Sequence, residues 1–271
     1  MPPLSPAEAA LTALAQTVGA RALLAFLALL ALLLLAAGLL ALSVRRAARR
    51  RGTRDAHPLA RLAQRLGLGF ALILGAGFVF AAIAGQIGTG ESLARIDVVF
   101  SDAVHSGTSA RALQVFGWVT HFGDPATLTG LSIVVAVGLL ARGERLLAFA
   151  YVLAVGGNAV LNPALKRVFE RARPLHENGP SLAEGWSFPS GHSSGALVAY
   201  GMLAYVLMRT LPHAWHLPAV LFATAAAFSV GASRVFLQVH FARDVVAGLA
   251  SGTAWLVACI VSVELARGQR R

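Results

Sequence analysis

The sequence predicts an all-α fold, a polytopic bundle of membrane-spanning helices. Of its 271 residues 57% are hydrophobic and only 13% are charged, and the mean hydropathy is +0.69. A soluble domain carries about 25% charged residues and could not bury this much apolar surface, so lipid must cover part of it. The same composition excludes a disordered chain, and the single cysteine, Cys259, excludes a disulfide scaffold.

Seven apolar stretches match or approach the roughly 20 residues that a helix needs to cross a bilayer. They are residues 22–44, 67–86, 126–141, 146–164, 192–208, 217–235 and 244–265. The first is uncharged from Leu23 to Val44 and is followed by a densely basic segment. Because a signal peptide has the reverse charge order, we interpret this stretch as a true span.

Basic residues are divided unevenly between the two ends of these spans. Fourteen arginines lie in residues 45–66, 142–145, 209–216 and 266–271. Cytoplasmic loops are enriched in Arg and Lys, so we expect these segments and the C-terminus in the cytoplasm and the N-terminus outside. The net charge of +11 then reflects topology and not a nucleic-acid partner.

Three segments remain on the outer side. Residues 87–125 are predicted to form one or two helices at the membrane interface, and residues 165–191 and 234–243 are shorter connections. All three contain polar residues that merit attention.

Lys166 is the only lysine in a chain with 22 arginines. Arg173 follows seven residues later, close to two helical turns, so the two side chains could share one helix face. A guanidinium can hold two phosphate oxygens and an ammonium acts as a point charge, which favours an anion site. Snorkelling of basic side chains at the membrane edge is the alternative.

The segment 187–194 (SFPSGHSS) leads directly into an apolar run. Pro189 and Ser190 indicate a helix start, and Gly191 allows the backbone to approach a ligand. The free amide groups of a helix start bind anions, and His192 in the first turn could donate a proton to a leaving group. A simple capped turn is the alternative.

His240 and Asp244 stand four residues apart, so on a helix the carboxylate lies beside the imidazole. If Asp244 accepts from one ring nitrogen, the other keeps a lone pair and can act as a nucleophile. Arg234 adds a third cation. Three cations, two histidines and one acid on the same side of the membrane are what phosphoryl transfer needs.

The order Lys-x6-Arg-Pro, Pro-Ser-Gly-His and Ser-Arg-x5-His-x3-Asp resembles the type 2 phosphatidic acid phosphatase superfamily, which includes vanadium haloperoxidases. The matching residues are Lys166, Arg173, Pro174, Pro189, Ser190, Gly191, His192, Ser233, Arg234, His240 and Asp244. The resemblance implies a six-helix phosphatase core over residues 67–265. Residues 1–66 would then add one N-terminal transmembrane helix and a basic cytoplasmic loop, and residues 266–271 a basic tail.

The resemblance also implies a reaction without metal or other cofactor, through a phosphohistidine. His240 would be the nucleophile, Asp244 would orient it, and His192 would protonate the leaving group. The phosphoryl oxygens would be held by Lys166, Arg173, Ser190, Gly191 and Arg234. The chain departs from the family at Gln238, Ala242 and Arg243, where the family often has Gly, Pro and an uncharged residue, and this leaves the substrate open.

Together these features predict a lipid phosphatase at the outer face of a bacterial cytoplasmic membrane. Its partners would be membrane lipids, and its substrate polyprenyl diphosphate, phosphatidic acid or phosphatidylglycerol phosphate. A phosphotransferase of the same superfamily is the first alternative. A lipid-phosphate transporter or a purely structural membrane protein would leave the pair of His240 and Asp244 without a role, and a haloperoxidase would be soluble.

A few other polar residues receive weaker interpretations. We interpret His121 and Asp124 as a surface turn, with a place at the rim of the site as the alternative. Arg167, Arg171 and Arg243 are expected to raise the positive potential that attracts an anionic headgroup.

Overall fold

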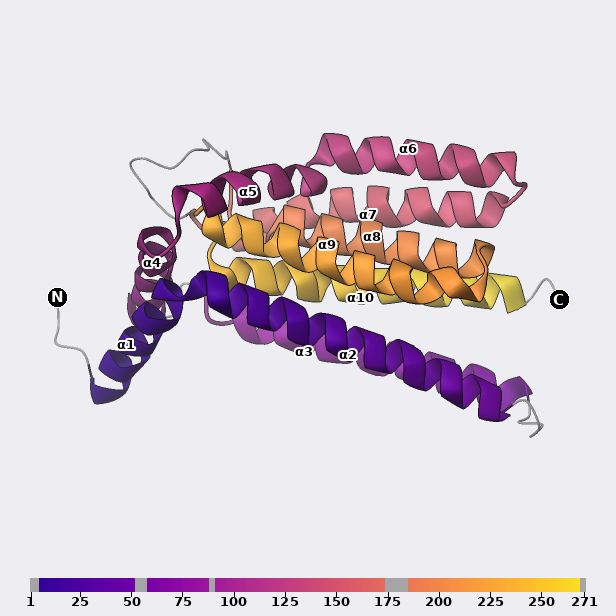
Figure 1. Ribbon diagram of the computed structural model, residues 1–271, viewed down its shortest axis with the longest axis horizontal. Helices are drawn as coiled ribbons and strands as arrows, with labels where there is room; N and C mark the ends of the chain where they lie inside the picture. The colour runs from indigo at the N-terminus through magenta and orange to yellow at the C-terminus, as the bar shows by residue number, and fades with distance from the viewer. Residues whose placement is uncertain (1–4, 52–57, 88–90, 174–184, 269–271) are drawn as a thin grey trace.

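The computed structural model describes residues 5–51, 58–87, 91–173 and 185–268, and this part of the chain is helical without strands (Figure 1). The helices are α1 (Pro6–Ala20), α2 (Ala22–Arg51), α3 (Pro58–Ala84), α4 (Glu91–Ser106), α5 (Ala110–Thr120), α6 (Pro125–Ala141), α7 (Arg145–Phe169), α8 (Gly191–Thr210), α9 (His216–Phe236) and α10 (Ala242–Gly268). Two short 3-10 turns, η1 (His121–Gly123) and η2 (His213–Trp215), precede α6 and α9. The predicted all-α bundle is confirmed.

The seven predicted spans correspond to α2, α3 and α6 to α10. Within the described residues five helices are long and apolar enough to cross a membrane: α2, α3, α7, α9 and α10. The pair α5 and α6, bent by 49°, gives a sixth. The seventh, α8, does not reach the same hydropathy, because its first turns carry His192 and several serines and glycines.

The position of α8 explains why it can be less apolar. It packs against α6, α7, α9 and α10, so protein and not lipid surrounds it. Val198 and Met202 face a core shared with α7 and α10, and Ala196 and Tyr200 face one shared with α9 and α6. By contrast, the apolar windows of α2 and α3 are only 0% and 6% buried, which makes them the peripheral, lipid-facing helices.

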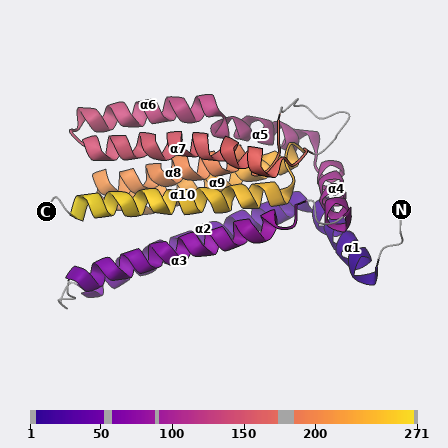
Figure 2. The same cartoon turned by 180° about the vertical axis from the view of Figure 1, so that it is seen from behind.

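One end of the bundle is covered by two further helices. Figures 1 and 2 show α1 and α4 lying across the end that is opposite the C-terminus, in contact with each other. The sequence predicted α4 and α5 within residues 87–125 but not α1. A capping box of Ser5 and Glu8 was the available signal, and Gly19 lets α1 approach α4 so closely that a Cβ there would lie 2.6 Å from Ala103 Cβ.

Close approach of helices is also required at Gly248 of α10. A Cβ at this position would lie 2.5 Å from the backbone oxygen of Ser190, at the start of α8. We expect Gly248→Ala to lower the free energy of unfolding by about 1–3 kcal/mol, because the backbone of α8 must move. The control is Gly75→Ala in α3, where no atom lies within 4 Å of the new Cβ and the change should stabilise the helix by up to about 1 kcal/mol. Thermal unfolding of both variants in detergent checks this; a destabilisation at Gly75 as large as at Gly248 would contradict it.

Candidate active site

The three sequence motifs meet at the end of the bundle that α4 covers. A cavity of about 400 Å³ lies between α6, α7 and α8 at this end. The predicted residues that line it are Lys166, Arg173, Gly191, His192, Arg234 and His240. Ser190 and Asp244 are fully buried directly behind them. A phosphate headgroup is small enough for a cavity of this volume.

His240 lies in the turn between α9 and α10 and is only 2% exposed. Its Nε2 is 3.3 Å from Nη1 of Arg173, and its Nδ1 is 3.6 Å from Oδ2 of Asp244, an ion-pair distance beyond a hydrogen bond. Burial, together with the charges of Arg173 and Arg234, outweighs the opposing effect of Asp244 and lowers the pKa of His240 to about 4. The imidazole is therefore neutral at pH 7 and retains a lone pair.

The turn that carries His240 is held by an unusual residue. Gln238 adopts φ +55°, in the left-handed region that favours glycine, at the position where the family often has Gly. Its side-chain Nε2 donates to the backbone oxygen of Ser101 in α4, 3.1 Å away. With Gln in place of Gly, the turn is strained, but the side chain of Gln238 gains a hydrogen bond to α4.

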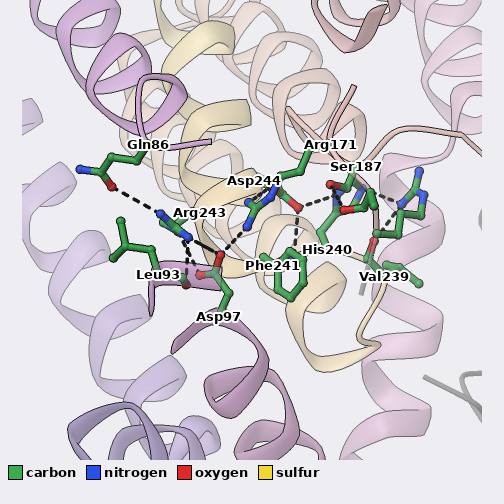
Figure 3. A network of polar contacts seen from close by, with 12 residues as sticks. Gln86, Leu93, Asp97, Arg171, Ser187, Val239, His240, Phe241, Arg243 and Asp244 are labelled. Atoms are coloured by element: carbon green, nitrogen blue, oxygen red, sulfur yellow. Dashed lines mark hydrogen bonds and ion pairs between the residues drawn. The ribbon is translucent and has the colours of Figure 1, made fainter. Parts of the chain in front are cut away.

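Asp244 is wholly buried, and a set of charged residues surrounds it (Figure 3). Its Oδ1 accepts from Nη1 of Arg171 at 2.5 Å, and its Oδ2 accepts from the backbone N–H of Phe241 at 3.0 Å. Asp97 of α4 forms an ion pair with Arg171, and its carboxylate also accepts from Nε and Nη2 of Arg243. The interpretation of Arg171 and Arg243 as sources of positive potential needs correction, because two aspartates neutralise both.

The three remaining cations reach the cavity from different elements. Lys166 lies in the last turn of α7 and Arg234 in the last turn of α9, where its Nη1 donates to Thr120 Oγ1 at 2.6 Å. We expected Arg173 to share a helix with Lys166, but it does not. The helix ends at Phe169, and Glu170 turns the chain with φ +42°, so Arg173 reaches back from the following loop. Pro174 lies outside the described residues.

The helix predicted to start at Ser190 does so, and Ser190 is the N-cap of α8. Its hydroxyl oxygen accepts from the N–H of Ser193 at 3.4 Å and from the hydroxyl of Ser193 at 2.9 Å. This hydroxyl therefore caps the helix, while the backbone of Gly191 faces the cavity. A Cβ on Gly191 would lie 2.8 Å from Asn162 Oδ1, so the side chain of Asn162 would have to shift to accommodate it.

Asp124 lies closer to the site than its interpretation as part of a surface turn predicts. Its Oδ1 lies 2.8 Å from Nε2 of His192, and its Oδ2 lies 2.7 Å from Nδ1 of His121. Burial alone would raise the pKa of Asp124, but the hydrogen bonds from His121 and His192 outweigh it and lower this pKa. An ionised carboxylate thus contacts the predicted acid.

The buried state of His240 gives a testable pH dependence. Histidine 15N NMR in detergent, assigned with His240→Gln, should give His240 a titration midpoint near pH 4 instead of 6.5. The folded protein then binds fewer protons than the unfolded chain between these values, so this group's contribution to the free energy of unfolding falls as the pH is lowered from 6.5 to 4. A midpoint at 6.5 would mean that His240 is not buried.

The ion pairs of Arg171 predict a second outcome. Arg171→Gln leaves the buried carboxylate of Asp244 without its cation, which should cost about 3–5 kcal/mol in the free energy of unfolding and sharply reduce turnover. Arg142→Gln, at an exposed arginine in the turn between α6 and α7, should change either quantity little. Chemical denaturation and phosphate release measure the two effects, and equal behaviour of the two variants would contradict the prediction.

The chain is similar to known proteins in sequence and in fold. The PAP2 superfamily model matches residues 146–267. Phosphatidylglycerophosphatase B of Bacillus subtilis (strain 168) is 35% identical over 142 residues, which cover 51% of this chain and 69% of that protein. The crystal structure of a transmembrane PAP2-type phosphatidylglycerolphosphate phosphatase from Bacillus subtilis superposes with a TM-score of 0.67 and 29% identity, covering 71% of this chain and 96% of the other. The chain therefore belongs to the PAP2 superfamily, among its membrane phosphatases.

Proposed function

We propose that the chain hydrolyses the phosphate headgroup of a membrane lipid through a phosphohistidine on Nε2 of His240. The observation that carries this proposal is the buried, neutral His240, with Nε2 beside Arg173 at the cavity and Nδ1 toward Asp244. A neutral imidazole with one nitrogen directed to a carboxylate is an activated nucleophile. A transporter would not need this pair.

The reaction takes two steps. Nε2 of His240 attacks the phosphorus atom while Lys166, Arg173 and Arg234 stabilise the charge on the phosphoryl oxygens. The bond to the lipid oxygen breaks, and His192 gives that oxygen a proton. His192 then removes a proton from a water molecule, which attacks the phosphorus, breaks the P–N bond and releases phosphate and neutral His240.

The substrate proposed first is phosphatidylglycerol phosphate, because two similar proteins carry that activity in their names. Phosphatidic acid and polyprenyl diphosphate share the headgroup chemistry that the three cations recognise. Ser190 and Gly191 would contribute at the start of α8, the first by capping the helix and the second through its backbone N–H.

We also propose that this site faces the outer side of a bacterial cytoplasmic membrane. The support is charge: fourteen arginines lie in the segments at the opposite end of the spans. In this arrangement residues 67–265 form the catalytic core, and α2 is an additional helix on its periphery.

The decisive experiment measures phosphate release by the purified full chain in detergent from each of the three lipids. Release without an added acceptor supports a hydrolase, and release only with an acceptor lipid would make it a phosphotransferase. Three cations occupy the place of a metal's charge, so EDTA should leave the rate unchanged; a loss restored by magnesium would contradict that mechanism.

The phosphohistidine has its own test. Substrate labelled with 32P in the headgroup should leave an acid-labile label on the wild-type chain after rapid quenching in base. His240→Ala should abolish the label and reduce phosphate release to background, whereas His105→Ala, an exposed position on α4, should change neither. A label that persists in His240→Ala would assign the nucleophile elsewhere.

A further inference from the structure

Asp124 occupies a position at which an aspartate ordinarily caps a helix. It is the N-cap of α6, with extended backbone angles of φ −65° and ψ 142°, yet its side chain makes no capping hydrogen bond. Such a carboxylate normally accepts from the second or third N–H of the helix. Here both oxygens instead meet imidazole nitrogens, those of His192 and His121.

The contact between Asp124 and His192 is enforced by packing. A Cβ on Gly123 would lie 2.4 Å from Val230 Cγ1 and 3.1 Å from His192 Cδ2, so η1 presses against the ring of His192. The hydroxyl of Tyr200, two turns along α8, donates to the backbone oxygen of Phe122 at 2.8 Å. These contacts fix the turn that carries Asp124 relative to α8.

The charges around His192 explain what its contact with Asp124 can do for catalysis. A general acid must carry its proton before the leaving group departs, but burial and the positive charges of Arg234 in α9 and Lys166 in α7 disfavour protonation of His192. Positive neighbours disfavour the imidazolium, so the cations that bind phosphate work against the acid. Asp124, itself flanked by His121 of η1, is the carboxylate that hydrogen-bonds to His192 within the described residues and opposes this effect.

We propose that Asp124 is a positioning residue that orients His192 and favours its protonated form, as a second carboxylate–imidazole pair beside that of Asp244 and His240. The proposal rests on the phosphatase function proposed above. Since Nε2 of His192 is bound to Asp124, the proton that moves is the one on Nδ1. It passes to the leaving oxygen in the first step and returns from water in the second, while Asp124 stays ionised throughout.

The test compares two leaving groups. For Asp124→Asn we expect kcat/KM for phosphatidylglycerol phosphate to fall about 10²-fold, at the lower end of what a general acid contributes. The loss for nitrophenyl phosphate should be much smaller, because nitrophenolate departs without a proton. The basic limb of the pH profile for the lipid should also move to lower pH. Equal losses on both substrates would overturn the proposal, because a purely structural role would give them.

Two variants and one direct measurement separate the remaining outcomes. Asn and Ser both suit a helix start but carry no charge, so near-wild-type activity on the lipid in Asp124→Asn or Asp124→Ser would overturn the proposal. His121→Gln, which removes only the exposed partner, should cost at most about fivefold. In the wild-type chain, 15N NMR should find Nε2 of His192 protonated across the titration; an unprotonated Nε2 overturns the proposal without any variant.

A double variant ties the effect to the acid. His192→Ala alone should show the same leaving-group selectivity, and adding Asp124→Asn to it should cause no further loss, because the two residues act as one unit. Additive losses would overturn the proposal. Failure of the underlying function looks different, since the wild-type chain would then release phosphate from neither substrate.

Discussion

The buried carboxylate of Asp244 is the charge around which this end of the molecule is organised. A carboxylate without solvent costs several kcal/mol unless cations and hydrogen-bond donors surround it. Arg171 and the N–H of Phe241 satisfy its oxygens, and its backbone oxygen accepts from the N–H of Ser190 at 3.0 Å. One residue therefore joins the loop after α7, the start of α8 and the start of α10, the segments that carry the three motifs.

The layer that α1 and α4 form contributes to the same arrangement from outside the core. Asp97 of α4 neutralises Arg171 and Arg243, and the backbone of Ser101 one turn later holds Gln238. Gly19 packs α1 tightly on α4. The N-terminal helices thus stabilise the turn of His240 without entering the cavity, which gives them a role beyond anchoring the chain in the membrane.

The sequence predicted the helices well because lipid imposes a strong constraint on length and polarity. The apolar run 146–164, for example, became α7, with ends that differ by one residue at the start and five at the finish. It also predicted which residues would line the cavity, since each motif sits at the end of a run. It could not predict the position of Arg173, because a left-handed turn at Glu170 ends the helix where periodicity would continue it.

The residues that pair with the predicted site residues could not be predicted from the sequence, for a different reason. Asp97 and Arg243 are 146 residues apart, and Asp124 and His192 are 68 apart, so no local spacing relates them. Local rules pair residues three or four positions apart, such as His240 with Asp244, and cannot relate residues from different helices. From sequence alone, a charged residue between two spans is predicted to be solvated, because the counter-charge that contacts it comes from a distant segment.

Asp97 and Asp124 both precede residue 146, where the match to the PAP2 superfamily begins. The matched segment therefore lacks the two carboxylates that pair with its arginines and with His192. A chimera that grafted residues 146–267 onto another helical scaffold would carry every residue of the three motifs and still inherit Arg171, Arg243 and His192 without these two acids. The charges that this site needs therefore extend beyond the residues that the family model matches.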